Sequence, residues 1–169
     1  NLRNWVTSIT ATKFQQNLYY NTGNGASCYN GNISSTTWKS GNETTTRGYK
    51  FTYDGANRMT GGVYGEGSTI SSNVNRFSEC ATYDKNGNIL SLQRKGQTSS
   101  SSYDQLDNLT YTYSGNQVTK IEDAASATPQ HGNTALTNGA SSAPEYSYDA
   151  NGNITQDLNK GMSIVEYKI

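Results

Sequence analysis

The heptapeptide YDKNGNI at residues 83–89 occurs again as YDANGNI at residues 148–154, with one residue changed. Weaker copies are YNGNI at residues 29–33, YDGANRM at 53–59 and YSGNQV at 113–118. The first tyrosines of successive copies lie 24, 30, 30 and 35 residues apart. A constant unit joined by connectors of variable length is typical of a repeat protein. The sequence therefore predicts a single repeat region over residues 1–169, with about five to six degenerate copies.

Each heptapeptide predicts the turn of a β-hairpin. Asp at the first turn position, Asn at the third and Gly where the backbone becomes left-handed match a type I turn with a G1 bulge. This predicts a positive φ at Gly87 and Gly152, with Tyr83 opposite Ile89 and Thr82 opposite Leu90. The residues to which we assign a structural role in the repeats are Tyr53, Asp54, Tyr83, Asp84, Gly87, Asn88, Tyr113, Gly115, Tyr148, Asp149, Gly152 and Asn153.

The segments before the turns alternate between aromatic and small polar residues, as in YKFTYD at residues 49–54 and LTYTYS at 109–114. This period of two predicts half-buried strands. Because a lone hairpin is marginally stable, the copies are expected to lie side by side. We predict an all-β fold of stacked antiparallel hairpins in one long twisted sheet, with the tyrosines that begin the heptapeptides on one face. SSYDQLDNL, at residues 101–109, has room for at most one helical turn.

The composition indicates that tyrosine replaces part of the usual apolar core. Leu, Ile, Val and Phe make up 24 of 169 residues, whereas the chain has 13 tyrosines. A buried tyrosine ring supplies apolar area while its hydroxyl reaches a polar partner. With 13 basic and 13 acidic residues the chain gives no electrostatic basis for binding nucleic acid or an acidic membrane. It also has no apolar stretch long enough to span a bilayer.

TYDKNGNILSLQRKG at residues 82–96, YSYDANGNITQDLNKG at 146–161 and FTYDGANRMTGG at 51–62 resemble the YD repeats of RHS-repeat proteins. The opening NLRNWVTSI resembles a half repeat of the version common in large surface proteins of Bacteroidetes, so the chain is expected to begin inside a repeat. The resemblance implies a very large secreted or cell-surface polypeptide whose repeats wind a β-sheet into a hollow shell. In bacterial polymorphic toxins that shell encloses a C-terminal toxic domain.

Two departures from the family pattern limit what the resemblance implies. The acidic, self-cleaving segment that closes such shells is not found in this sequence, and six repeats are too few to close one. The expected function is therefore that of a structural wall segment without enzymatic activity or a cofactor. Its expected partners are the rest of its own polypeptide, including further repeats and a C-terminal cargo domain.

Sites with chemical function were weighed against plainer interpretations. The D-x-N-G-N turns offer oxygen ligands, but glycine and the terminal acid are not spaced as in an EF-hand loop, so an Asx-capped turn is favoured over calcium. His131 is the only histidine and is expected to lie in a loop, which gives no basis for a His-dependent nucleophile or a zinc site. The acidic pairs Glu122–Asp123 and Asp104–Asp107 are expected to be solvated rather than catalytic.

Three interpretations remain open at this stage. Trp5 and Trp38 are candidates for stacking on a glycan, which gives an alternative function as a carbohydrate-binding or cell-surface adhesion module, although inward packing is favoured. Cys28 and Cys80 are sufficient for one disulfide, but two thiols so distant in sequence are more often separate. Sheet edges at Asn1 and at Ile169, the end of SIVEYKI, predict self-association through unpaired main-chain groups.

Overall fold

The computed structural model describes residues 2–130, 132, 134–136 and 144–167 and is all-β. The strands are β1 (Ser8–Ala11), β2 (Phe14–Tyr19), β3 (Ser35–Ser40), β4 (Arg47–Tyr53), β5 (Met59–Glu66), β6 (Glu79–Tyr83), β7 (Ile89–Gln97), β8 (Tyr103–Ser114), β9 (Gln117–Asp123), β10 (Tyr146–Tyr148) and β11 (Ile154–Asp157). Within these described residues, the one helical element is the short 3-10 helix η1 (Leu158–Lys160). None of the described segments forms a helix of the length and apolarity that crossing a membrane requires.

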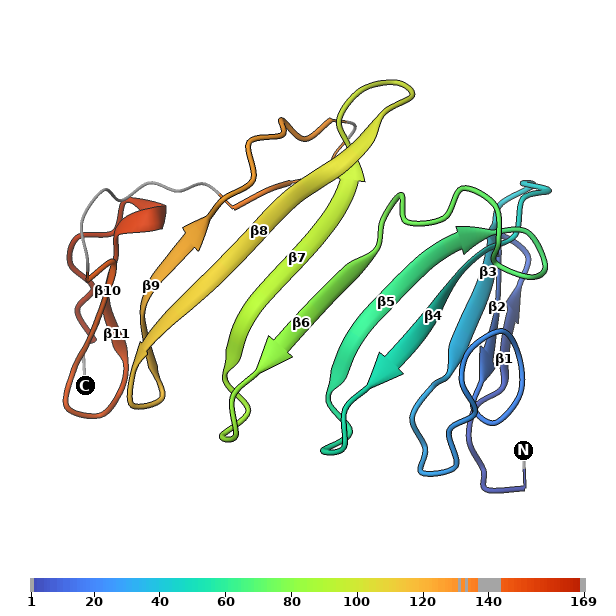
Figure 1. Ribbon diagram of the computed structural model, residues 1–169, viewed down its shortest axis with the longest axis horizontal. Coiled ribbons are helices and arrows are strands. Elements are labelled where there is room, and N and C mark those ends of the chain that lie inside the picture. The colour runs from blue at the N-terminus through green and yellow to red at the C-terminus, as the bar shows by residue number, and fades with distance from the viewer. Residues whose placement is uncertain (1, 131, 133, 137–143, 168–169) are drawn as a thin grey trace.

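The first nine strands form one antiparallel sheet in which neighbours in sequence are neighbours in space (Figure 1). The last two strands pair with each other in a separate two-stranded sheet beside β9. The all-β prediction is confirmed, whereas the single continuous sheet was wrong for the last hairpin. The physical reason lies at Glu145, whose N–H donates to the carbonyl of Thr119 while its carboxylate accepts the N–H of Ile121. The Glu145 carboxylate thus accepts the Ile121 N–H, which a regular ladder would pair with a main-chain carbonyl.

The edges expected at Asn1 and Ile169 lie outside the described residues. As far as Tyr167, the segment SIVEYKI folds back on β11, because Val165 N–H bonds the carbonyl of Thr155 at 2.8 Å and the Tyr167 hydroxyl bonds that of Ile154.

Four of the five turns expected from the repeat copies are followed by the same irregularity. The register shifts between Thr52 and Tyr53, Thr82 and Tyr83, Thr112 and Tyr113, and Ser147 and Tyr148. Tyr83 lies opposite Ile89 as predicted, but Thr82 lies opposite Ser91, so the predicted pairing of Thr82 with Leu90 was wrong. Leu90 is the additional residue of a β-bulge, which locally increases the twist of the strands.

The register defines two faces of the nine-stranded sheet. Phe51, Gly62 and Glu79 are neighbours across three strands, and alternation from them places Tyr53 and Tyr83 on one face. Ala81, Leu92 and Leu109 connect that face to Tyr113. We call it the aromatic face, and the opposite one, which carries Thr52, Thr82 and Thr112, the threonine face. The prediction of a shared face therefore holds for three tyrosines, while Tyr148 lies in the second sheet.

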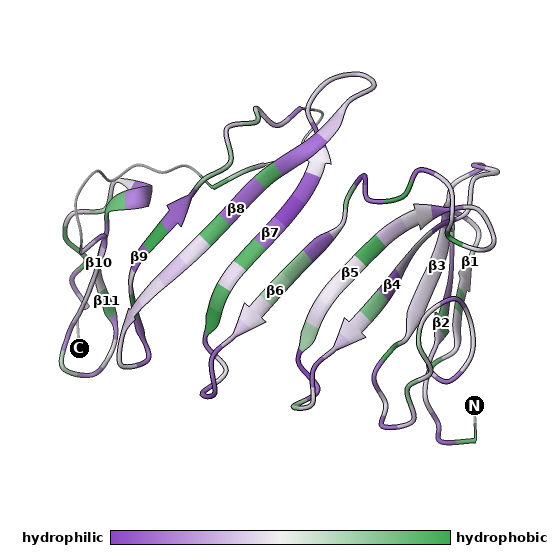
Figure 2. Cartoon of the chain, in the orientation of Figure 1, coloured by the Kyte–Doolittle hydropathy of each residue, from purple (hydrophilic) through white to green (hydrophobic). Residues whose placement is uncertain are grey.

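Apolar residues form separate bands along the strands (Figure 2), and the buried core of the aromatic face is small. It includes Tyr64 and Leu109, whereas the buried Ile70, from the connector between β5 and β6, packs on the threonine face. Gly48 and Gly65 are paired across β4 and β5, and a Cβ at either would lie 2.7 Å from a side-chain atom of Ile70. The two glycines therefore provide the space in which the connector packs against the sheet.

Two strands extend well beyond the repeat copies. β5 continues to Glu66, and β8 begins at Tyr103, so the segment given room for a helical turn is a strand. Phe77, in the connector, packs edge to face with Tyr64 at 5.1 Å and with Tyr103 at 5.2 Å between ring centroids. The alternation in this region was obscured by small residues, because glycine and serine carry little hydropathic signal.

Candidate functional site

The most regular site in the molecule is the turn that follows each repeat tyrosine. In one copy Asp84 Oδ1 accepts the N–H groups of Asn86 and Asn88, both at 2.8 Å, and Oδ2 accepts the amide of Asn88 at 2.8 Å. Asp149 makes the same three contacts in its own turn with Asn151 and Asn153. Gly87 and Gly152 have φ of 95° and 85°, which confirms the predicted left-handed conformation.

The other turns use the same scheme with different residues. Asp54 Oδ1 accepts the N–H groups of Ala56 and Arg58, and Arg58 Nε donates to Oδ2 at 2.7 Å. Asn57, with φ of 63°, occupies the position that glycine holds elsewhere. The turn after Tyr113 has two residues and a left-handed Gly115, with Ser114 paired to Gln117. Because both oxygens of Asp54, Asp84 and Asp149 accept N–H donors, these three turns are Asx-capped.

The same contacts stabilise the charged form of each Asp. The main-chain N–H of Arg58 is the largest cause of a lowered pKa at Asp54. The side-chain amide of Asn88 is the largest cause at Asp84, and that of Asn153 at Asp149, where it also lowers the pKa. Adjacent turns also touch each other, since Asn88 donates to Asn116 Oδ1 at 3.1 Å and Arg58 donates to the carbonyl of Asp84 at 2.5 Å.

A second regular feature connects one hairpin to the next. The hydroxyl of each repeat tyrosine donates to the main-chain carbonyl of the residue that follows the preceding turn, and we call this contact the inter-hairpin tyrosine bond. The four bonds are Tyr53 to Ile33 at 2.8 Å, Tyr83 to Met59 at 2.7 Å, Tyr113 to Ile89 at 2.8 Å and Tyr148 to Val118 at 2.9 Å. Tyr20 makes the same bond to Val6 at 2.8 Å, and Tyr167 bonds Ile154 at 3.1 Å.

The position of these bonds follows from where the ladders end. β7 and β8 are paired only as far as Ser91 and Thr110, so Ile89 lies beyond the last pair. Asp84 N–H bonds the carbonyl of Asn88, and the alternation of an antiparallel pair then directs the carbonyl of Ile89 away from β6 and toward β8. The tyrosine hydroxyl supplies the donor that a strand no longer supplies. Burial raises the pKa of the Tyr53, Tyr113 and Tyr148 hydroxyls.

The first copy of the repeat, at residues 29–33, differs from the others in the place of its tyrosine. Tyr29 lies in the loop between β2 and β3 and is 65% exposed, and Tyr20 makes the inter-hairpin tyrosine bond in its place. The carbonyl of Ile33, at the end of the same copy, nevertheless accepts from Tyr53.

The two tryptophans have different surroundings. Trp38 stacks on Tyr49, with ring centroids 5.7 Å apart, and lies 6.4 Å from Tyr64, so it belongs to the aromatic row on the sheet. Trp5 packs on Tyr20 at 4.8 Å, and the guanidinium of Arg3 lies over its ring at 5.0 Å. The inward packing favoured from the sequence thus describes Trp38 well.

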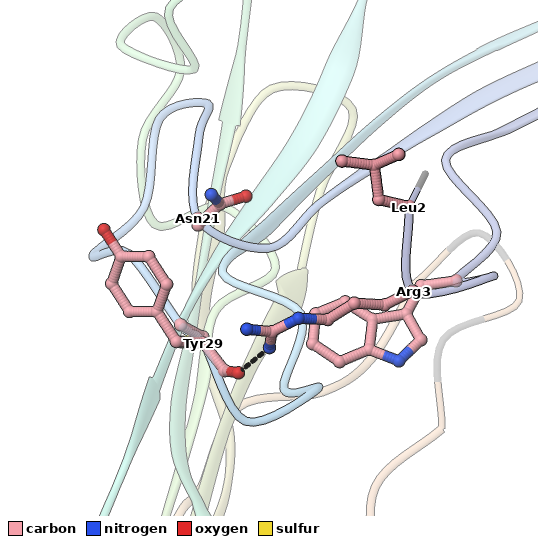
Figure 3. A pocket seen from close by; sticks show the side chains of 6 residues that line it. Leu2, Arg3, Asn21 and Tyr29 are labelled. Carbon is pink, nitrogen blue, oxygen red and sulfur yellow. Dashed lines mark hydrogen bonds between the residues drawn. The ribbon is translucent and has the colours of Figure 1, made fainter.

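Trp5 also lines a pocket of about 220 Å³ (Figure 3). The other lining residues are Leu2, Arg3, Asn21, Cys28 and Tyr29. Arg3 donates to the carbonyl of Tyr29 across this pocket, and the Tyr29 ring lies at its rim (Figure 3). Two aromatic rings beside a guanidinium and an amide provide both an apolar surface and hydrogen-bond donors.

A larger groove, of about 310 Å³, lies where β5 and β6 share only two residue pairs. Its lining includes Gly61, Val63, Cys80, Gln93 and Lys95, and none of the described lining residues is aromatic. Cys80 is exposed and Cys28 is half-buried, and both are free thiols, so the disulfide is not formed in this structure.

The acidic pairs weighed as catalytic do not share a site. Asp107 is buried, pairs with Arg94 at 2.5 Å and accepts the N–H of Leu136, whereas Asp104 is exposed. Asp123 accepts the N–H groups of Asn108 and Ala125, while Glu122 is exposed beside Lys120. His131 lies outside the described residues. Asp107 therefore anchors the connector after β9, a role that its position in the sequence did not indicate.

No protein-family model matches the chain, and no curated protein is significantly similar to it.

Proposed function

We propose that this chain is a structural wall segment of an exported RHS/YD-repeat protein, in which stacked hairpins enclose or present a domain of the same polypeptide. The observation that carries the proposal is the inter-hairpin tyrosine bond, which recurs between successive repeats at 2.7–2.9 Å. A wall made of short hairpins needs a connection that repeats with each unit and tolerates connectors of different length. The tyrosine bond meets both needs, because it joins positions fixed relative to the turns.

Two further observations support a non-enzymatic role. The turn carboxylates are committed to main-chain N–H donors, and the buried Asp107 is ion-paired with Arg94. The acidic residues that recur in the turns therefore stabilise the main chain by accepting its N–H groups. Neighbouring turns also contact each other through polar side chains, as Arg58 does with the carbonyl of Asp84 and Asn88 with Asn116.

The test is photo-crosslinking of the protein at its natural length. A benzophenone amino acid would replace Tyr111 on the aromatic face or its neighbour Thr110 on the threonine face. A wall has an inner and an outer side, so one of these positions should crosslink to residues outside the repeat region and the other should not. Equal crosslinking from both, or none from either, would contradict the wall function.

A second candidate function, carbohydrate binding, is favoured by the pocket at Trp5. The rings of Trp5 and Tyr29 and the donors of Arg3 and Asn21 suit a sugar, which presents an apolar face and a hydroxyl rim. Glycan-array binding that is lost in Trp5→Ala and retained in Trp38→Phe would support it. Glycan binding that survives Trp5→Ala would contradict this second function. A parent chain that binds no glycan would also contradict it.

A further inference from the structure

A compact group of aromatic rings lies in the interior of the nine-stranded sheet, on β3, β4 and β5, each of which is paired on both sides. Trp38 stacks on Tyr49 with ring centroids 5.7 Å apart, and Tyr64 lies 6.4 Å from the first ring and 5.6 Å from the second. Trp38 and Tyr49 are half-buried, whereas Tyr64 is only 2% exposed. We call these three residues the ring triad. Neighbouring rings thus connect the surface of the sheet to a buried tyrosine.

The hydroxyl of Tyr64 differs from the other tyrosine hydroxyls in its acceptor. It donates to Glu66 Oε1 at 2.8 Å, and within the described part of the chain no other tyrosine donates to a carboxylate. The other hydroxyls that donate a hydrogen bond give it to main-chain carbonyls, and they belong to Tyr20, Tyr49, Tyr53, Tyr83, Tyr113, Tyr148 and Tyr167. A carbonyl oxygen is a very weak base, whereas a carboxylate can take the proton itself. Among these tyrosines, Tyr64 therefore has the acceptor to which its proton can be transferred.

Glu66 is held in its charged form by the groups around it. Burial opposes the charge, but the amide of Asn73, which donates to Oε2 at 2.7 Å, and the hydroxyl of Tyr64 lower the pKa of Glu66. The guanidinium of Arg76, 3.9 Å from Oε1, and that of Arg47, opposite Glu66 across β4 and β5, lower this pKa as well. Burial raises the pKa of the Tyr64 hydroxyl, and the bond to Glu66 raises it further. Before any oxidation the proton therefore stays on Tyr64.

We propose that Tyr64 is a one-electron redox site, which is oxidised through the ring triad by a one-electron oxidant in solution. The oxidant takes one electron from the ring of Trp38, and Tyr64 returns one electron to Trp38, directly or through Tyr49. The hydroxyl proton of Tyr64 moves at the same time along the 2.8 Å hydrogen bond to Glu66 Oε1. The products are a neutral tyrosyl radical at Tyr64, a protonated Glu66 and the one-electron-reduced oxidant. A one-electron donor in solution reverses the step and returns the proton to Tyr64.

The proton acceptor determines which tyrosine holds the radical. A phenol that loses an electron and keeps its proton becomes a radical cation, and a new uncompensated charge is costly inside a protein. Transfer of the proton to Glu66 avoids that charge on Tyr64. Tyr49 has no such acceptor, because its hydroxyl donates to the carbonyl of Phe77 at 2.8 Å. Since Tyr64 is buried, its radical is also shielded from reaction with a second radical in solution. This inference is independent of the wall function.

Flash oxidation with a photogenerated ruthenium(III) polypyridyl complex tests the site. Electron paramagnetic resonance of the parent chain should show a persistent tyrosyl radical. The radical should form more slowly in heavy water than in ordinary water, because a proton moves with the electron. Tyr64→Phe should abolish the persistent signal. Tyr49→Phe is the matched control and should keep it, since the ring stays in the triad and only a hydroxyl with a carbonyl acceptor is lost.

Glu66→Gln separates proton transfer from packing. The amide oxygen can still accept the hydroxyl of Tyr64 but cannot take its proton, so the radical yield should fall several-fold and the difference between the two kinds of water should disappear. Circular dichroism checks that each variant is folded. The proposal is overturned if the parent chain gives no tyrosyl radical or if the signal persists in Tyr64→Phe. It is also overturned if Glu66→Gln keeps the parental yield and isotope effect, or if Tyr49→Phe loses the signal as Tyr64→Phe does.

Discussion

The hydroxyl of Tyr113 donates a hydrogen bond of 2.8 Å to the main-chain carbonyl of Ile89, which lies 24 residues earlier in the chain. Ile89 is the first residue after its own turn, and Tyr113 is the last aromatic residue before the next one. The bond therefore joins the outgoing strand of one hairpin to the incoming strand of the next, beyond the last residue pair of the ladder between them. Its recurrence at Tyr53, Tyr83 and Tyr148 indicates a rule of assembly rather than a local contact.

Tyr113→Phe tests a single inter-hairpin tyrosine bond. The ring stays in place while the donor to Ile89 is lost, so the free energy of unfolding should fall by about 1 kcal/mol, the net value of one hydrogen bond. Urea denaturation measures the change. Tyr29→Phe, on an exposed ring, is the control and should leave the midpoint unchanged; equal effects of the two substitutions would argue against the bond.

Gly87→Ala tests the turn geometry. With φ of 95°, a Cβ at this position is strained although no atom lies within 4 Å of it, so about 1–2 kcal/mol should be lost. Gly55→Ala is the matched control, because Gly55 also has open space in a turn but lacks the positive φ. Thermal melts that rank the two variants equally would show that the turn tolerates a side chain.

The acid limit of stability should come from the turn carboxylates. Hydrogen bonds from the amides of Asn88 and Asn153 lower the pKa of Asp84 and Asp149 in the folded chain. A lowered folded pKa gives stability that is present above the unfolded value of about 4 and is lost as the pH falls through the folded pKa. Asp84→Asn should make the melting temperature less dependent on pH between about 4 and 2. An unchanged slope would exclude Asp84 as a contributor.

The alkaline limit should come from buried tyrosines. Burial is the main cause that raises the pKa of Tyr49 to about 12. A raised folded pKa gives stability that is complete below the unfolded value of about 10 and is lost as the pH rises toward the folded one. Ultraviolet titration of phenolate should show a late-ionising group that disappears in Tyr49→Phe. If every tyrosine ionises near pH 10 while the chain is folded, this assignment is wrong.

Glu145→Ala should release the last hairpin from the sheet. The carboxylate is fully buried and accepts the N–H of Ile121 and the amide of Asn159, while its Oε1 has no hydrogen-bond partner among the described residues. Its removal leaves the Ile121 donor unpaired at a cost of about 1–3 kcal/mol. Hydrogen exchange at Ile121 should accelerate. Glu122→Ala, on an exposed neighbour, should not change that rate; protection that survives Glu145→Ala would assign the attachment to other contacts.

The repeating parts of this structure could be predicted from the sequence, whereas the contacts that occur only once could not. The heptapeptides predicted the left-handed Gly87 and Gly152 and the pairing of Tyr83 with Ile89, because turn chemistry is local and recurs. The bulge at Leu90 was missed, since regular alternation was extended through it. Ile70 over Gly48, Arg94 with Asp107 and the carboxylate of Glu145 each join distant segments once, and a pattern that occurs once gives no periodic signal.

The inter-hairpin tyrosine bond could be predicted from the sequence only in part. Alternation placed the tyrosines on a face, but the acceptor is a main-chain carbonyl that every residue has. The main-chain carbonyls that accept these bonds lie where the ladder between two hairpins has ended, and the length of the ladder is a property of the folded sheet. The acceptors are Ile33, Met59, Ile89 and Val118.

The central claim is that tyrosine hydroxyls hold successive hairpins together, and it is tested most directly by one urea-unfolding comparison. The variant combines Tyr53→Phe, Tyr83→Phe, Tyr113→Phe and Tyr148→Phe, which keeps every ring and removes four donors. It should lose about 2–6 kcal/mol, a large share of the roughly 5–15 kcal/mol by which folded domains are stable. The same unfolding midpoint and slope as the parent chain would contradict the claim.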